Sequence, residues 1–134
     1  MTLVMCFGSF DILHEGHLDL FRQADALGDR LVVVVARDAT IMAVKGRAPV
    51  HDEKARLTAV RAARHVDEAV LGNDGDKHDV IRSVRPDVVA LGYDQTRFIK
   101  GLESLALTTD HPFRIVRLLP FHPHIYKSSR LRKD

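Results

Sequence analysis

Residues 8–17 are Gly8-Ser9-Phe10-Asp11-Ile12-Leu13-His14-Glu15-Gly16-His17, and they follow the apolar run Leu3 to Phe7. Gly8 has no Cβ, so the backbone can turn tightly there and approach a phosphate closely. The helical segment that follows begins near Gly16, and the unpaired N–H groups of a helix start attract anions. His14 and His17 lie three residues apart across that start, so both rings can face one anion. The stretch therefore predicts a strand, a phosphate-binding turn and a helix.

Apolar runs of strand length recur along the rest of the chain, at 31–36, 66–71, 88–91 and 115–119. Segments with helical spacing lie between them at 20–27, 57–63 and 80–84, and 98–106 is a candidate for a fourth helix. Buried strands joined by helix-length crossovers imply a mostly parallel sheet with right-handed connections. We predict an α/β fold, a Rossmann-like α/β/α sandwich with a five-stranded, mostly parallel sheet.

The bulk composition predicts one globular domain spanning residues 1–134, either as the whole protein or as one domain of a longer protein. The 20 Lys and Arg residues against 18 Asp and Glu are spread along the chain, which does not suggest nucleic-acid binding. The single cysteine, Cys6, lies in an apolar run and is expected in the core. No signal peptide or membrane-length apolar segment is present, so we expect a soluble, cytoplasmic protein without a membrane partner.

Polar segments follow four of the predicted strands, and in parallel sheets ligands bind outside the carboxyl ends of the strands. After the second strand come Arg37 and Asp38, then a loop with Lys45 and Arg47. An ordinary strand exit explains Arg37 and Asp38 as well as a ligand contact does. A solvated basic loop explains Lys45 and Arg47 as well as a phosphate contact does. After the fourth strand, Gly92 permits close approach, and Asp94 can accept hydrogen bonds from a sugar or base. Ser128 and Ser129 follow the fifth strand and can offer hydroxyl and helix-start N–H groups to phosphates.

The chemistry indicated at this edge is phosphoryl transfer. Two imidazoles can donate hydrogen bonds to a phosphate whose negative charge grows during transfer. Neither His14 nor His17 has to be a general base, because a phosphomonoester is already a nucleophile. Zinc is less favoured, since His-Glu-Gly-His differs from the His-Glu-x-x-His spacing and no third ligand is evident. His122 and His124 alternate as on an extended segment that lines the approach to the site or lies at the surface.

Residues 8–17 match the Gly-x-Phe-Asp-x-x-His-x-Gly-His signature, and the whole chain resembles the cytidylyltransferase-like nucleotidyltransferases. The resemblance implies transfer of an NMP group from an NTP to a phosphorylated acceptor with release of pyrophosphate. It implies catalytic roles for His14, His17 and Lys45. The segment 126–131 partly matches the family's second signature, whose Arg falls on His122 here, with Lys127 or Arg130 as its replacement.

The remaining expected site residues form two groups. Those expected to bind the nucleotide are Gly8, Ser9, Phe10, Asp11, Gly16, Gly92, Tyr93, Asp94, Lys127, Ser128, Ser129 and Arg130. Those expected at the acceptor are Arg37, Asp38, Arg47, Arg56 and His122, of which Arg56 matches an Arg of the family. No protein side chain is expected to bind a metal. Mg²⁺ or another divalent cation should be held mainly by the triphosphate and water, while Asp11 orders the loop.

Within the family, segments 33–38, 66–73 and 91–95 look most similar to archaeal FAD synthetases, which implies ATP and FMN as substrates. The alternative is a CTP-dependent cytidylyltransferase acting on glycerol 3-phosphate or another small phosphate or phosphonate. A hypothesis of another class is a non-catalytic nucleotide-binding module. The intact His pair argues against the last, because binding alone would not require both rings. The resemblance also leads us to expect a homodimer.

Overall fold

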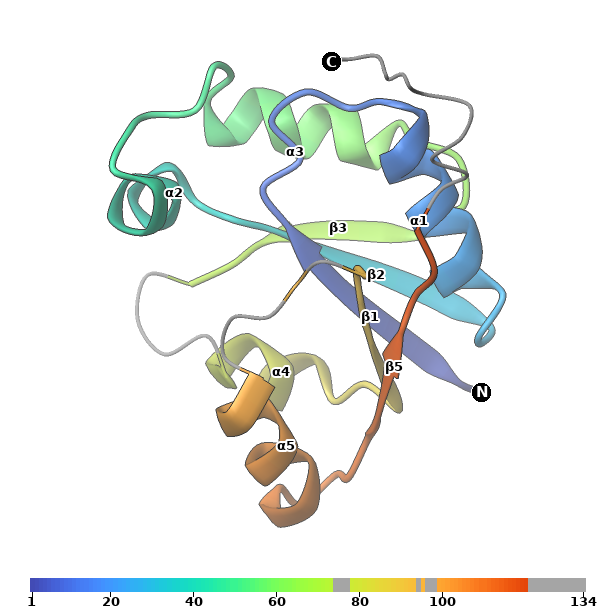
Figure 1. The fold of residues 1–134 in the computed structure, drawn as a ribbon. Helices are drawn as coiled ribbons and strands as arrows, with labels where there is room; N and C mark the ends of the chain where they lie inside the picture. The colour runs from blue at the N-terminus through green and yellow to red at the C-terminus, as the bar shows by residue number, and fades with distance from the viewer. Residues whose placement is uncertain (74–77, 94, 96–98, 121–134) are drawn as a thin grey trace.

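A computed structural model of the protein describes residues 1–73, 78–93, 95 and 99–120. Strands and helices alternate along this part of the chain (Figure 1). In chain order they are β1 (Leu3–Gly8), α1 (Glu15–Asp25), β2 (Arg30–Val35), α2 (Asp38–Lys45), α3 (Glu53–Arg61), β3 (Glu68–Leu71), α4 (His78–Val84), β4 (Val88–Leu91), α5 (Ile99–Thr108) and β5 (Arg114–Arg117).

The strands form one sheet in the order β3-β2-β1-β4-β5, and each neighbouring pair is parallel. This confirms the predicted Rossmann-like sandwich with a five-stranded parallel sheet. The strand order reverses at β1, because the chain builds outward first to β3 and then to β5. In open parallel sheets a ligand crevice forms at such a reversal, beyond the carboxyl ends of the strands.

Helices cover both faces of the sheet, so β1 is buried on both sides (Figure 1). Val4 and Cys6 point into one core with residues of α1 and α3, while Met5 points into the other core with residues of α4 and α5. Cys6 is 1% exposed, which confirms its predicted place in the core. Among the described residues, no helix has the length and apolar character that crossing a membrane requires.

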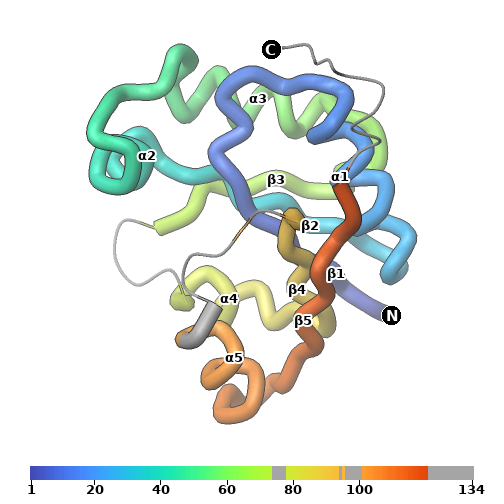
Figure 2. Tube along the Cα trace, in the orientation of Figure 1, coloured from blue at the N-terminus to red at the C-terminus, as the bar shows by residue number. Residues whose placement is uncertain are grey.

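Helix α2 is absent from the sequence prediction, which placed Lys45 in a loop. It stands beyond the carboxyl ends of β1 and β2 (Figure 2). Its eight residues span barely two turns, and only Ile41 among them is buried, so the apolar spacing is too weak to reveal it. Gly46 ends the helix with φ at +74°, a conformation that glycine adopts without strain. Lys45 therefore lies on the last turn of a helix.

Candidate active site at the carboxyl edge of the sheet

The turn after β1 is shaped by Phe10. This residue has φ at +50° and is 4% exposed, so the chain folds its ring back into the core. The ring packs on Phe21 and makes an edge contact with His17, with centroids 5.4 Å apart. A Cβ at Gly8 would lie 2.6 Å from the ring, so glycine is required there. Because its side chain is buried, any contact of Phe10 with a nucleotide would come from its backbone.

His14 and His17 form a stacked pair at the start of α1, with ring centroids 3.9 Å apart. His14 is the N-cap, and its Nδ1 accepts a hydrogen bond from the Gly16 N–H at 3.0 Å. The Nδ1 of His17 accepts from the His14 N–H at 3.3 Å. A neutral imidazole that accepts at Nδ1 carries its proton on Nε2. Both rings are thus set up as Nε2–H donors beside the N–H groups of a helix start.

Asp11 connects the signature loop, residues 9–14 between β1 and α1, to the segment before α3. Its carboxylate accepts hydrogen bonds from the N–H groups of Val50 at 2.7 Å and His51 at 2.8 Å. The Nδ1 of His51 also lies 2.7 Å from the backbone oxygen of Asp11. The two backbone donors, His51 first, lower the pKa of the Asp11 carboxyl below its ordinary value. The carboxylate orders the loop, as the sequence suggested.

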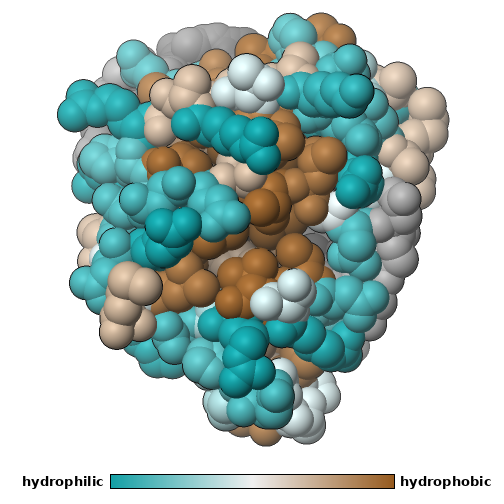
Figure 3. Space-filling model, turned by 180° about the vertical axis from the view of Figure 1, so that it is seen from behind, coloured by the Kyte–Doolittle hydropathy of each residue, from teal (hydrophilic) through white to brown (hydrophobic). Residues whose placement is uncertain are grey.

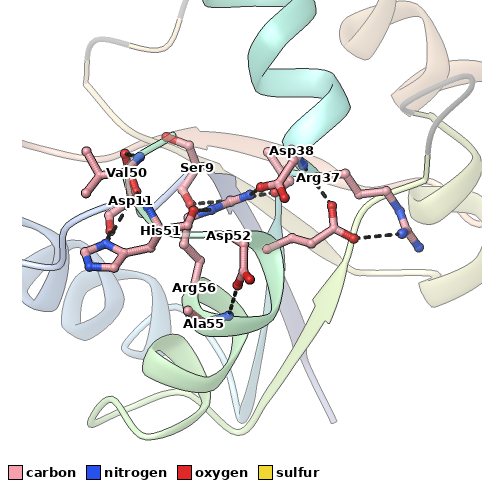
Figure 4. A network of polar contacts seen from close by, with 11 residues as sticks. Ser9, Asp11, Arg37, Asp38, Val50, His51, Asp52, Ala55 and Arg56 are labelled. Carbon is pink, nitrogen blue, oxygen red and sulfur yellow. Dashed lines mark hydrogen bonds and ion pairs between the residues drawn. The ribbon is translucent and has the colours of Figure 1, made fainter. Parts of the chain in front are cut away.

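Arg56 is the centre of a buried polar network, and its side chain is 0% exposed (Figure 4). Its guanidinium donates to the backbone oxygens of Ser9 at 2.9 Å, Ala36 at 2.6 Å and His51 at 3.0 Å. It also pairs with the Asp38 carboxylate at 2.7 Å. The structure corrects the acceptor contact predicted for Arg56, because a guanidinium enclosed by these four partners cannot meet a substrate. It positions the signature loop, the end of β2 and the start of α2.

Arg37 and Asp38 stand at the start of α2 (Figure 4). Glu53 of α3 holds both in place. The Glu53 carboxylate accepts from the Asp38 N–H at 2.9 Å and lies 3.4 Å from an Arg37 guanidinium nitrogen. Arg37 also donates to the backbone oxygen of Gly72, beyond β3. Both residues thus lie at the predicted edge, although their side chains are engaged with protein partners.

A pocket of about 450 Å³ opens between α2, α4 and the carboxyl ends of β1 and β2. Gly8, Ser9, Arg37 and Lys45 of the predicted site residues line it. Most of the other lining residues are apolar, and in a view from behind, hydrophobic residues gather in the middle of the face within a hydrophilic rim (Figure 3). Arg47 lies just past α2, with an exposed side chain. The pocket has the size and lining of a small-molecule site.

Gly92 and Tyr93 follow β4, as predicted, and two residues that the prediction left unassigned hold this turn. The Gln95 side chain accepts from the Gly92 N–H at 2.7 Å and donates to the Phe7 oxygen at 2.9 Å. Arg117 of β5 donates to the backbone oxygens of Gly92 and Gln95. Gly92 is buried, whereas Tyr93 is 59% exposed beside it. A charged residue inside an apolar strand, as Arg117 is, was the signal available in the sequence.

Several predicted site residues lie outside the described part of the chain. They are Asp94, His122, Lys127, Ser128, Ser129 and Arg130. The described residues that do converge are the His pair, the turn after β1, the start and end of α2 and the turn after β4. They come from three chain segments, which follow β1, β2 and β4 and share the carboxyl edge of the sheet.

Comparison with known proteins gives one consistent family. The model of the cytidylyltransferase-like family matches residues 5–133. An FAD synthase of Thermoplasma volcanium is 40% identical over 133 residues, which cover 99% of this chain and 93% of the relative. An FAD synthase of Pyrococcus abyssi is 37% identical, covering 96% of this chain and 85% of the relative.

A solved structure agrees with the fold. It is a crystal structure described as the lipopolysaccharide core biosynthesis protein from Thermoplasma volcanium. Its sequence is 40% identical, it superposes with a TM-score of 0.83, and the match covers 90% of this chain and 98% of that one. The backbone arrangement that positions the edge residues is therefore found in an experimental structure of a similar protein.

Proposed function

Because the chain belongs to the cytidylyltransferase-like family, we propose that this nucleotidyltransferase moves AMP from ATP to FMN and so makes FAD and pyrophosphate. Relatives that are 37% to 40% identical over nearly the whole chain and carry the name FAD synthase support the choice of substrates. The observation that carries the reaction class is the stacked His pair at the start of α1, with Nε2–H donors on both rings.

In the proposed reaction an oxygen of the FMN phosphate attacks the α-phosphorus of ATP. A new P–O bond forms to that oxygen, and the bond between the α-phosphorus and the bridging oxygen breaks. Pyrophosphate leaves with the electron pair of the broken bond. The FMN phosphate is already anionic, so no protein base has to remove a proton. The protein contributes position and electrostatic stabilisation, which supply most of the catalysis in phosphoryl transfer.

His14 and His17 stabilise the transition state in this proposal. Negative charge grows on the oxygens of the α-phosphate and on the leaving pyrophosphate. In the proposal, the Nε2–H donors and the helix N–H groups meet this charge. Donors whose orientation is already fixed need no reorganisation as the charge develops. Phe10 fixes the His17 ring from one side, and the Gly16 N–H fixes the His14 ring. Lys45, on the rim of the pocket, adds a positive charge near the phosphates.

We propose that a divalent cation enters with the nucleotide as part of the substrate. Within the described residues, no group of three or more His, Cys, Asp or Glu side chains is placed to hold a metal. Both oxygens of the Asp11 carboxylate already accept backbone hydrogen bonds. Mg²⁺ binds readily to triphosphate oxygens and keeps several waters, so it does not need a dedicated protein cage.

The decisive experiment measures pyrophosphate release and nucleotide product with ATP or CTP crossed against FMN, glycerol 3-phosphate and a small phosphonate. We expect FAD and equimolar pyrophosphate from ATP and FMN with Mg²⁺ present. A variant with both His14 and His17 changed to Ala serves as the background. Turnover with CTP alone would contradict the proposal in favour of a cytidylyltransferase. Nucleotide binding without turnover of any pair would point to a binding module.

A further inference from the structure

The pocket beside α2 has a lining that is chemically unlike the phosphate site. Its walls include Val34 of β2, Val44 of α2 and Val80 of α4, and its volume is about 450 Å³. Ligand pockets of roughly 300 to 1,000 Å³ typically enclose molecules of drug or cofactor size. The lining also includes polar residues such as Thr40 and Gln95, but most of it is apolar. The hydroxyl groups of a polyol phosphate would therefore meet few partners there, which costs free energy. A flat aromatic ring system would instead bury apolar surface there.

Helix α2 keeps the pocket open because it presents two small side chains to it. Ala39 and Ala43 are four residues apart, so they share one face of the helix, and both line the pocket. Both are exposed, which means that no other part of the described chain covers them. Any larger side chain at either position would extend into the pocket. These two residues therefore limit the room available to a ligand on the α2 side of the pocket.

The pocket and the His pair lie on opposite faces of the sheet, on either side of the carboxyl end of β1. The core beside α1 lies on one face, and Val80 comes from α4 on the other. Gly8 and Ser9 both line the pocket and begin the loop that leads to the His pair. A phosphate over Gly8 and Ser9 can thus join a ring in the pocket to a nucleotide at α1. This arrangement brings an acceptor and an α-phosphate to one point from two sides.

We infer that this pocket holds the isoalloxazine ring of the acceptor flavin, and that Ala39 and Ala43 determine the size of ring that it admits. The inference rests on the proposed FMN adenylyltransferase activity and assigns the acceptor ring to a described surface. Gly8 and Ser9 lie between the ring and the His pair, and Lys45 lies at the rim for the phosphate. Because the walls recognise the ring, binding does not require the phosphate group.

Riboflavin tests the inference, because it carries the ring without the phosphate and cannot be adenylylated by phosphate attack. Binding is followed by quenching or polarisation of flavin fluorescence on the wild-type chain, Ala43→Leu and Ala39→Leu. The matched control is Met42→Leu, since Met42 lies on the same helix, is 47% exposed and does not line the pocket. ATP binding, measured as a shift in melting temperature, shows that each variant is folded.

We expect riboflavin to bind the wild-type chain and Met42→Leu alike, and Ala43→Leu to weaken its binding at least tenfold while ATP still raises the melting temperature. Equal riboflavin binding by wild type and Ala43→Leu would overturn the inference. Loss of ATP binding with flavin binding retained in Ala43→Leu would also overturn it, because the pocket would then hold the nucleotide. Flavin binding that depends on Ala43, without FAD formation from ATP and FMN, would support the pocket and contradict the proposed function.

Discussion

At the scale of single residues, the tautomer of the two imidazoles is decided by the backbone. Nδ1 of each ring accepts an N–H hydrogen bond at the start of α1, so each Nε2 carries the proton that can be donated. The same hydrogen bonds and the 3.9 Å stacking hold both rings in one orientation before any substrate arrives. Preorganisation of this kind lowers the barrier because the donors do not have to turn when charge develops.

We predict that His14→Ala or His17→Ala lowers kcat by about 100-fold or more, which is the usual effect of removing one transition-state donor. KM for ATP should change less, because the helix N–H groups still bind the phosphates. Steady-state kinetics of pyrophosphate release measure both constants. The control is His65→Asn, since His65 pairs with Asp25 away from this edge and asparagine tolerates its φ of +74°. Unchanged kcat in either Ala variant would rule out the proposed role.

Arg56 gives a second prediction at this scale. Lysine keeps the charge but is a point donor, and it cannot serve three backbone oxygens and a carboxylate that surround a planar guanidinium. Arg56→Lys should lower the free energy of unfolding by about 1 to 3 kcal/mol, the cost of a buried group left without its partner. It should also lower kcat, because Ser9 and the start of α2 lose their common anchor.

Urea unfolding and steady-state kinetics of Arg56→Lys measure both effects, and Arg61→Lys is the control variant. Arg61 is on the same helix, and its Nε donates a hydrogen bond to the backbone oxygen of Ala69 at 3.2 Å. We expect Arg61→Lys to keep near wild-type kcat. If Arg56→Lys has wild-type stability and kcat, the network does not position the site.

At the scale of elements, the connection between α2 and α3 depends on Asp11. The N–H groups of Val50 and His51 in this connection both donate to the Asp11 carboxylate. The connection begins just after Lys45, which is the last residue of α2. The signature loop and α2 are thereby held at a defined separation. This separation matters for the proposed reaction, which joins a nucleotide near α1 to an acceptor near α2.

We predict that Asp11→Asn lowers kcat/KM several-fold, because the amide has one acceptor oxygen and turns its NH₂ group toward a backbone N–H. The pKa of Asp11 is lowered in the folded state, so its contribution is present above the ordinary value of 3.8 and is lost only as the pH falls through the lower folded pKa. The ratio of wild-type to variant kcat/KM should therefore be constant between about pH 5 and pH 9. A ratio that varies across this range would contradict the assignment.

At the scale of the whole molecule, the amino edge of the sheet is held by aspartates from neighbouring segments. Asp87 accepts the Leu3 N–H at 2.7 Å, Asp67 accepts the Leu31 N–H at 2.7 Å, and Asp29 accepts the Thr2 N–H at 2.7 Å. Each contact joins residues that are 27 or more positions apart in the chain. These three contacts stabilise the edge opposite the candidate active site.

We predict that Asp87→Ala destabilises the fold at neutral pH by about 1 kcal/mol, the usual contribution of one hydrogen bond. The pKa of Asp87 is lowered mainly by the Leu3 N–H, with His111 adding to the effect against the cost of burial. A lowered folded pKa means that this stabilisation is present above 3.8 and is lost as the pH falls through the folded pKa. Urea unfolding at pH 7 and at about pH 3 should show a smaller difference between wild type and variant at the acidic pH. An equal difference at both would contradict it.

The strands and the His pair could be predicted from the sequence, because each depends on residues close together in the chain. The parallel sheet could be predicted because strands alternate with helix-length crossovers. Apolar runs mark buried strands, and the spacing of His14 and His17 at a helix start brings the rings together without help from elsewhere. Helix α2 could not be predicted, because it is short and buries only one side chain. The pocket depends on α2, so its existence was hidden as well.

Long-range contacts decided the rest. Arg56 meets the Ser9 oxygen across 47 positions, and Asp11 meets the Val50 N–H across 39, and nothing in either local pattern specifies these partners. The sequence indicated only that Arg56 belonged near the site. The structure shows that Arg56 is buried among backbone oxygens and the Asp38 carboxylate, so it positions the protein chain instead of contacting substrate. Chain spacing thus determined the proposed reaction centre, because its geometry is that of one helix turn. Packing of distant segments determined the pocket and its supports, because those distances exist only once the sheet has formed.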